Sequence, residues 1–227
     1  MAQYSRIETA LVMRKSGIVP VFYHPVPEIC LNVMKACYDG GARVFEFTNR
    51  GDFAHEIFGL LIKSGKDLPG MIIGAGSIVD PVTAGLYIQN GANFIVSPVL
   101  NEDMARMCNR RKILWSPGCG SASEVSRAEE LGAEIVKIFP AGEVGGPDFV
   151  KNIKGPMPWS SIMPTGGVDL SYENLMEWFK AGVWCVGMGS KLFTKELIQK
   201  KDFDGISKRI AEAISLVEKI KGELNLK

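Results

Sequence analysis

The stretch GIVPVFYHPVPEICLNVMKACYDGGARVFEF, residues 17–47, contains a strand, a helix and a second strand in succession. The run 17–23 is short, apolar and rich in β-branched and aromatic residues, which is typical of a buried strand. Apolar residues then recur every four positions until a pair of glycines at 40–41, as in a helix with a glycine stop. The apolar run 42–47 follows at once, so the stretch predicts a βαβ unit with two parallel strands.

The same alternation continues along the rest of the 227-residue chain. Further strands are predicted over 71–77, 93–98, 113–118, 134–140, 161–167 and 184–190. Helices are predicted over 4–15, 53–65, 80–91, 101–110, 121–132, 146–153, 171–182 and 203–222. Eight such units without a break in composition predict one α/β domain over 1–227, a (β/α)8 TIM barrel with an extra N-terminal helix. An open doubly wound sheet is the alternative, but the first strand ends in FYHP and not in a G-x-G-x-x-G fingerprint.

The composition narrows the possible partners and the compartment. Lys and Arg number 26 against 25 Asp and Glu, and a net charge of +1 gives no electrostatic reason to expect nucleic acid or a membrane as partner. The sequence has neither an apolar run of the roughly 20 residues that span a bilayer nor the apolar core of a secretory signal. Five scattered cysteines predict reduced thiols in a cytoplasm, and two distant histidines predict no metal site.

Two predicted strands carry charged residues among apolar ones. On the second strand, Glu46, Thr48 and Arg50 share one face, opposite two phenylalanines. On the sixth strand, Lys137 shares a face with Phe139. Helices pack outside a barrel, so the phenylalanines of the second strand suit the outer face and the polar residues suit the interior. We therefore expect Glu46 and Lys137 to occupy the same interior space near the ends of their strands.

A buried pair of Glu46 and Lys137 has a structural and a catalytic interpretation. Removal of one partner from a buried pair costs roughly 3–5 kcal/mol, but apolar residues in place of both are often neutral or better. Stability alone therefore explains such a pair poorly. Burial lowers the pKa of an amine, a neutral amine attacks carbonyls to form Schiff bases, and a nearby carboxylate moves protons. The pattern favours the catalytic interpretation.

Other strand ends carry weaker signals. The seventh strand ends in PTGG (164–167) and the eighth in GMGS (187–190). Each motif alone can be a tight turn, but phosphate sites recur after strands seven and eight of such barrels, where glycine lets N–H groups approach an anion. Ser77 ends the third strand and Pro98 ends the fourth. Cys119, after the fifth strand, is expected to be a small buried hydrophobe and not a nucleophile.

The ordered motifs VPVF, GGARVFEFTNR, IGAGSIVD, GANFIVSP, SPGCGSASE, EIVKIFPA, PTGGV and CVGMGS resemble one known family. They are those of the 2-dehydro-3-deoxyphosphogluconate (KDPG) and 4-hydroxy-2-oxoglutarate (KHG) aldolases, a class I aldolase family of (β/α)8 barrels. The resemblance covers about residues 17–213. It implies that Lys137 forms the Schiff base, that Glu46 is the general acid and base, and that no metal or cofactor is needed. Family members of this kind are typically homotrimers, so a homotrimer is expected.

The resemblance also implies a set of binding residues. The substrate carboxylate and the pyruvate moiety would contact Arg50, Ser77, Pro98 and Phe139. The phosphate would contact Thr165, Gly166, Gly167, Gly189 and Ser190. Ser77 stands where the family motif GAGT has threonine, and Val99 stands where glycine is usual. The segment GCGSASE also departs from the family's threonine-containing pattern.

The implied reaction is the cleavage of a 2-keto-3-deoxy-6-phospho sugar acid to pyruvate and glyceraldehyde 3-phosphate. The same chemistry on 4-hydroxy-2-oxoglutarate, giving pyruvate and glyoxylate, or on 2-dehydro-3-deoxy-6-phosphogalactonate is an alternative. A sugar-phosphate decarboxylase or epimerase is less favoured, because such decarboxylases carry Asp-x-Lys where this chain has Ile135 before Lys137. A non-catalytic barrel that binds phosphorylated metabolites would be expected to keep the glycines and lose Lys137 or Glu46.

Overall fold

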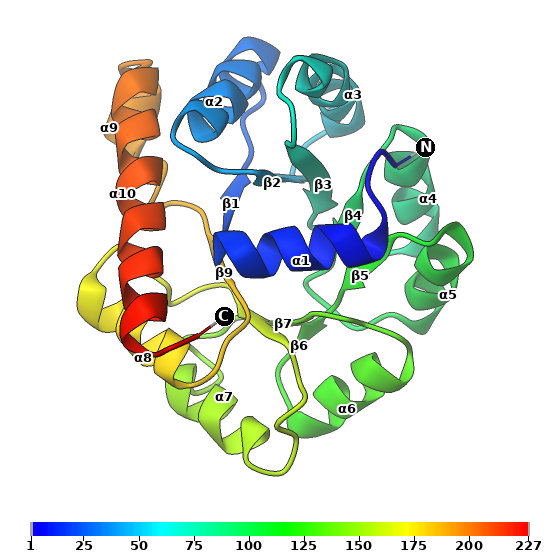
Figure 1. Cartoon of the computed structure of the whole chain (residues 1–227). Helices are drawn as coiled ribbons and strands as arrows, with labels where there is room; N and C mark the ends of the chain where they lie inside the picture. The colour runs from blue at the N-terminus through cyan, green and yellow to red at the C-terminus, as the bar shows by residue number, and fades with distance from the viewer. Residues whose placement is uncertain (1, 227) are drawn as a thin grey trace.

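A computed structural model describes residues 2–226, in which helices alternate with parallel strands (Figure 1). The strands are β1 (Ile18–Phe22), β2 (Val44–Thr48), β3 (Ile72–Gly76), β4 (Phe94–Val96), β5 (Leu114–Ser116), β6 (Gly118–Cys119), β7 (Val136–Ile138), β8 (Ile162–Pro164) and β9 (Val186–Met188). The helices are α1 (Arg6–Ser16), α2 (Pro27–Asp39), α3 (Ala54–Ser64), the 3-10 helix η1 (Gly65–Asp67), α4 (Pro81–Gln89), α5 (Glu102–Arg111), α6 (Ala122–Glu130), α7 (Gly146–Lys154), α8 (Tyr172–Lys180), α9 (Lys195–Gln199) and α10 (Phe203–Glu223).

The strands form a curled parallel sheet in two parts. One part has the order β5-β4-β3-β2-β1-β9 and the other has the order β6-β7-β8. A single parallel bridge joins Thr165, just after β8, to Gly187 on β9. Nearby, the backbone N–H of Trp184 donates to the carbonyl of Ile162 at 2.8 Å. The parallel pairing expected from the alternation of strands and helices is confirmed.

The prediction of one continuous fifth strand over 113–118 is wrong, because Pro117 divides it into β5 and β6. Proline has no backbone N–H and cannot donate to a neighbouring strand. The carbonyl of Pro117 still accepts a hydrogen bond from the N–H of Lys137 at 2.9 Å. Since β5 pairs with β4 and β6 pairs with β7, the chain passes at Pro117 from one part of the sheet to the other.

The alternation of side chains along each strand builds two apolar layers. Phe45 and Phe47 of β2 point outward and belong to the layer between the strands and the surrounding helices. The inner layer contains Ala10, Met13, Val19, Val44, Ile72, Phe94, Val96, Leu114, Ile135, Met163 and Cys185. Met13 of α1 is completely buried in this layer, and burial of such a side chain contributes roughly 1.5–3 kcal/mol. The extra N-terminal helix thus closes the inner core at one end.

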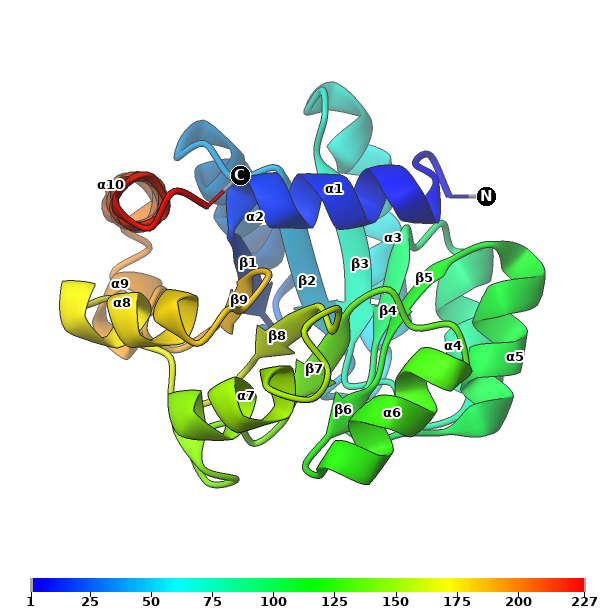
Figure 2. The same cartoon turned by 60° about the horizontal axis from the view of Figure 1, so that its bottom comes forward.

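Helix α1 lies across the end of the sheet at which the strands begin. Gly17 ends α1 in a left-handed conformation, and β1 starts at the next residue. Figure 1 shows α1 across the middle of the ring of helices, and Figure 2 shows the strands running away from it. The opposite end, where the strands stop, is therefore the end at which side chains can meet a ligand.

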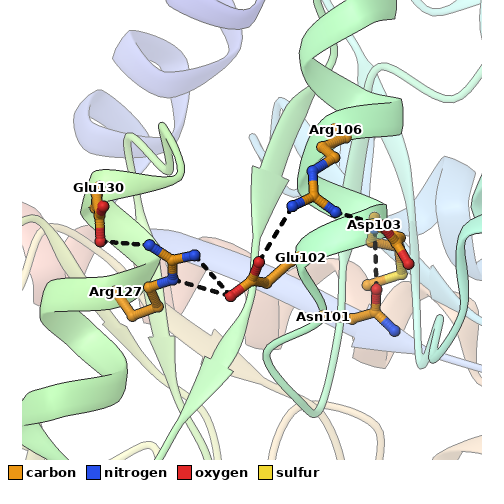
Figure 3. Close-up of polar contacts among 7 residues, drawn as sticks. Asn101, Glu102, Asp103, Arg106, Arg127 and Glu130 are labelled. Carbon is orange, nitrogen blue, oxygen red and sulfur yellow. Dashed lines mark hydrogen bonds and ion pairs between the residues drawn. The ribbon is translucent and has the colours of Figure 1, made fainter.

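On the outside, a polar network connects α5 and α6 (Figure 3). Arg127 of α6 donates to Glu102 Oε1 at 3.0 and 2.7 Å and to Glu130 Oε2 at 2.6 Å. Arg106 of α5 donates to the same Glu102 at 3.3 Å and to Asp103 at 2.6 Å. These groups are largely exposed, so the network adds little to stability. Among residues 2–226, no helix is long and apolar enough to cross a bilayer.

Candidate active site

Glu46 and Lys137 both lie in the interior of the curled sheet, near the ends of β2 and β7. The Glu46 side chain is completely buried, and Lys137 is 5% exposed. Two positions earlier on each strand, Val44 and Ile135 belong to the inner apolar layer. The predicted inward alternation of these strands is therefore confirmed. On the neighbouring strand β3, Gly74 faces Glu46 in the register and carries no side chain that would compete for the interior.

The environment moves both ionisable groups toward their neutral forms. Burial raises the pKa of the Glu46 carboxyl, and the positive charges of Lys137 and Arg50 oppose this by a smaller amount. Burial likewise lowers the pKa of the Lys137 amine; the charge of Glu46 acts in the opposite direction, and Arg50 adds to the lowering. A larger neutral fraction makes the amine a better nucleophile toward carbonyls. A carboxyl group with a raised pKa is a stronger proton acceptor, when ionised, than an ordinary carboxylate.

Several polar side-chain atoms in and near the interior of the sheet have no hydrogen-bond partner. Both carboxylate oxygens of Glu46 and the hydroxyls of Thr48, Ser116 and Thr165 are buried and make no hydrogen bond within residues 2–226. A buried polar atom without a partner costs roughly 1–3 kcal/mol. Because this cost is large, unpaired polar groups inside a protein are typical of a site that binds a polar ligand. Ser116 was not predicted, although its alternation with Leu114 of the inner layer was a signal that could have identified it.

A cavity of about 560 Å³ opens at the ends of the strands. Most of the residues predicted for substrate binding line it, although they come from four different strand ends. These lining residues are Arg50, Phe139, Thr165, Gly166, Gly167, Gly189 and Ser190. Thr48 also lines the cavity. The amine of Lys137 lies 4.8 Å from the centre of the Phe139 ring, which places it beside this cavity wall.

The cavity wall formed by β9 and the segment after β8 requires glycine at three positions. A Cβ atom at Gly187 would overlap the hydroxyl of Thr165, so only glycine permits this contact. Gly166 and Gly167 have φ values of +88° and +75°, which side-chain-bearing residues rarely adopt. Gly166, Gly167 and Gly187 therefore have a structural requirement, and the exposed backbone of Gly166 and Gly167 lies at the cavity.

Neither Glu46 nor Lys137 lines this cavity, and two of the predicted substrate-binding residues, Ser77 and Pro98, also lie outside its lining. Ser77 follows β3 at the same edge of the sheet, is half-buried, and has a φ of +58°. Pro98 follows β4, is half-buried, and packs against Gly118, where a Cβ atom would overlap the Pro98 backbone. Both lie at strand ends on the correct edge, and their contact with substrate stays a prediction.

Several residues that line the cavity were not predicted from the sequence, and four of them carry a polar or aromatic side chain beyond a strand end. They are Tyr23, Asp169, Lys191 and Phe193. Each follows a strand or a glycine motif by only a few residues, and this position is the signal that strand-end reasoning could have used. Tyr23 packs its ring against Phe47 at 5.7 Å between centroids and places its hydroxyl over Gly51, where a Cβ atom would overlap it.

Cys119 has the features of a structural residue. Its side chain is 1% exposed, and burial raises the pKa of the thiol to about 12. A thiol with such a pKa is almost entirely protonated at neutral pH and is a poor nucleophile. The description of Cys119 as a small hydrophobe is confirmed. Within the described chain, no three or more His, Cys, Asp or Glu side chains are grouped so that they could hold a metal ion.

Comparison with known proteins assigns the family. The family model described as KDPG and KHG aldolase matches residues 9–209 of this chain. The chain belongs to the KDPG and KHG aldolase family. A 2-dehydro-3-deoxy-phosphogluconate aldolase of Pseudomonas aeruginosa is 32% identical over 211 residues, which is 92% of each protein.

Solved structures of KDPG aldolases share the fold. One from Legionella pneumophila, with pyruvate captured as a covalent carbinolamine intermediate, superposes with a TM-score of 0.82 at 29% identity. It covers 90% of this chain and 97% of its own. One from Zymomonas mobilis, with 3-phosphoglycerate, has a TM-score of 0.80 at 26% identity and covers 94% and 97% of the two chains. This aldolase family thus includes close structural neighbours that hold a keto acid covalently or a phosphorylated three-carbon acid.

Proposed function

We propose that this chain is a metal-independent class I aldolase that cleaves a 2-keto-3-deoxy-6-phospho sugar acid to pyruvate and glyceraldehyde 3-phosphate. The observation that carries the proposal is the burial of Lys137 and Glu46 in the same interior, where the charge of each acts on the other, beside a cavity lined by Arg50 and the glycine-rich ends of β8 and β9. The carbinolamine trapped in the related KDPG aldolase supports covalent chemistry with pyruvate here as well.

The mechanism begins at Lys137. Its neutral amine attacks the C2 carbonyl of the keto acid, the carbonyl oxygen is protonated and leaves as water with the uptake of one proton overall, and a positively charged iminium forms. Glu46, directly or through a water molecule, takes the proton of the C4 hydroxyl while the C3–C4 bond breaks and its electron pair moves into the enamine. Glyceraldehyde 3-phosphate then departs. Protonation of the enamine at C3 and addition of water at C2 release pyruvate and regenerate the amine.

The remaining residues position the substrate. Arg50 pairs with the C1 carboxylate, since a guanidinium binds a carboxylate through two parallel hydrogen bonds. Ser77, Pro98 and Phe139 border the pyruvate moiety. The phosphate is bound by backbone and hydroxyl groups of Thr165, Gly166, Gly167, Gly189 and Ser190. No cofactor other than the covalent link at Lys137 takes part.

The test of this function is reductive trapping combined with a turnover assay. Borohydride added with pyruvate should attach a three-carbon unit to Lys137, identified by mass spectrometry. The chain should also release pyruvate from the phosphorylated keto acid, measured with lactate dehydrogenase. An adduct at another lysine would contradict the assignment of Lys137. Absence of turnover together with retained phosphate-ester binding would favour the alternative, a non-catalytic barrel that binds phosphorylated metabolites.

Two other substrates fit the same chemistry. 4-Hydroxy-2-oxoglutarate would give pyruvate and glyoxylate, and the family model includes KHG aldolases. 2-Dehydro-3-deoxy-6-phosphogalactonate differs from the gluconate-derived substrate in configuration at C4. We favour the gluconate-derived phosphate because the glycine-rich strand ends line the cavity and because the related Pseudomonas aeruginosa protein acts on it by name. Values of kcat/KM for the three substrates decide between them.

The finer architecture that we infer is a single (β/α)8 barrel domain over residues 1–227. In this interpretation, β5 and β6 together form the fifth strand. The bridge between Thr165 and Gly187 and the hydrogen bond from Trp184 to Ile162 support continuity between β8 and β9. An experimental structure with an open gap between these two strands would contradict it.

We also infer a homotrimer, in a cytoplasm that keeps the thiols reduced. Exposed apolar side chains on and around α4 support self-association: Val79, Val82, Leu86 and Val99. Val82 is the most exposed of these four, at 81%. Light scattering during gel filtration should give the mass of three chains, and Val82→Asp should reduce it. All five cysteines are free and buried, which supports the reducing compartment.

A further inference from the structure

The charged residues of the cavity wall are distributed unevenly. Arg50 follows β2, whereas Lys191 follows β9 and Asp169 follows β8. In the sheet, β1 lies between β2 and β9. Neighbouring strands are roughly 4.8 Å apart, so strands β2 and β9 are separated by roughly 10 Å. Among residues 2–226, the cavity is therefore lined by one cation on each side of the end of β1 and by one carboxylate, which is on the side of Lys191.

Asp169 would disfavour a phosphate unless a cation is close. Its carboxylate accepts a hydrogen bond from the Ser171 hydroxyl at 2.7 Å, and it lines the same cavity as Gly166 and Gly167. Backbone N–H groups and the Ser190 hydroxyl are neutral donors, which bind a phosphate but do not cancel a neighbouring negative charge. Arg50 stands on the other side of β1. The lining cation on the Asp169 side of the cavity is Lys191.

The backbone around Lys191 is held in place. Its carbonyl accepts a hydrogen bond from Arg209 Nε of α10 at 2.8 Å. The N–H groups of Leu192 and Phe193 both donate to the carbonyl of Gly189, at 2.9 and 3.1 Å. The ammonium group, by contrast, has no carboxylate within ion-pair distance among residues 2–226. Lys191 is therefore a free cation on a fixed turn, adjacent in sequence to Ser190.

We propose that Lys191 is a specificity-determining residue, whose ammonium pairs with the terminal phosphate of the substrate and offsets the charge of Asp169. This assignment rests on the proposed function and refines its substrate class. A lysine acts on phosphate as a mobile point charge, so it favours a dianionic terminus over a neutral hydroxyl without requiring one fixed geometry. A substrate that binds both Arg50 and Lys191 has a carboxylate at C1 and a dianionic group at its other end.

The kinetic test uses Lys191→Met and two substrates, the phosphorylated keto-deoxy sugar acid and its counterpart with a free C6 hydroxyl. Loss of an exposed charge pair should raise KM for the phosphorylated substrate by up to about fivefold, with kcat retained, because binding is lost equally in ground and transition states. KM for the hydroxyl counterpart should rise by less than about twofold. Lys191→Arg should restore the wild-type KM, since it keeps the charge.

The matched control is Lys195→Met, which removes the same charge four residues later from an exposed position outside the cavity lining. Its KM values should match those of the wild type. Added salt should raise KM for the phosphorylated substrate more in the wild type than in Lys191→Met, because salt screens an exposed pair. Equal KM values in Lys191→Met and Lys195→Met, or an equal rise for both substrates, would overturn the assignment.

A binding measurement separates this inference from the proposed function. Inorganic phosphate, titrated calorimetrically into the resting protein, should bind up to about fivefold more weakly to Lys191→Met than to the wild type or to Lys195→Met. If the wild type released no pyruvate, the proposed function would fail, and the phosphate titration would still decide the role of Lys191. Equal phosphate affinity in all three proteins would show that Lys191 does not contact the anion.

Discussion

The carboxylate of Glu46 lies directly against the backbone of Gly76 on the neighbouring strand, so a Cβ atom at position 76 would overlap Glu46 Oε1. Gly76 ends β3 within regular extended structure and has no left-handed conformation that would by itself require glycine. Gly76 of the GAGS motif is therefore needed because a larger residue would overlap Glu46, the candidate general acid and base.

The substitution Gly76→Ala should reduce kcat by about 10²-fold, because displacement of a catalytic group by about 1 Å has an effect of that size. Turnover and thermal unfolding of the same preparation measure the effect. Gly59→Ala is the matched control, since Gly59 lies in α3 and a Cβ atom there would meet nothing within 4 Å. That control should keep its activity and gain up to about 1 kcal/mol in unfolding free energy. A folded Gly76→Ala protein with wild-type kcat would refute the requirement for space.

The pH dependence of the Lys137 amine should follow its surroundings. Burial lowers its pKa from the ordinary value of 10.5, so the reactive neutral form should appear at lower pH than in a free lysine. The rate of acylation of Lys137, followed by mass spectrometry, should therefore rise with pH with a midpoint below 10.5. The charge of Glu46 raises this pKa, so Glu46→Gln should move the midpoint further down. An unshifted midpoint in the wild type would favour a purely structural polar layer.

Glu46→Gln also separates the two chemical roles. Loss of the proton acceptor should reduce kcat for cleavage by about 10²- to 10⁴-fold. The amine of Lys137 remains, so borohydride should still trap pyruvate on it. Lys137→Met should abolish trapping and turnover together. Full cleavage activity in Glu46→Gln would assign proton transfer to another group.

The thiols should be unreactive in the folded protein. Burial raises the pKa of Cys30 to about 11 and those of Cys108, Cys119 and Cys185 to about 12, and it also raises that of Cys37. Since the thiolate is the reactive form, a disulfide reagent at pH 8 should modify these cysteines slowly before unfolding and all five rapidly afterwards. Rapid labelling of Cys119 in the native state, or loss of turnover in Cys119→Ala, would contradict its structural role.

Arg6 should stabilise the fold without affecting catalysis. It donates to Asn109 Oδ1 at 2.9 Å and to the Gly132 carbonyl at 2.6 Å, and it pairs with Glu134 at the end of the sheet that α1 covers. Arg6→Ala should lower the free energy of unfolding by about 1–3 kcal/mol, measured with urea, because partly buried acceptors lose a charged donor. Arg110→Ala, an exposed control on α5, should change it by less than about 0.5 kcal/mol. A change in kcat for folded Arg6→Ala would be unexpected at this distance from the strand ends.

The local features of this protein could be predicted from its sequence because they depend on short-range rules. Side chains alternate along a strand, so Val44, Glu46 and Thr48 share one face of β2 and Phe45 and Phe47 share the other. Since the phenylalanines pack against the outer helices, the face with Val44 and Glu46 points into the interior. The family motifs then supplied roles for Lys137 and Glu46. The division of the fifth strand at Pro117 was missed, although the missing N–H of proline was visible in the sequence.

The composition of the cavity wall depended on the tertiary structure. Tyr23, Asp169 and Lys191 follow three different strands, and the distances between strand ends depend on how the sheet curls, which involves contacts far apart in the chain. Burial of Lys137 and Glu46, and hence the direction of their pKa shifts, likewise requires the surrounding strands and α1. Local alternation determined which way each side chain points; long-range packing decided which of them meet and how little water reaches them.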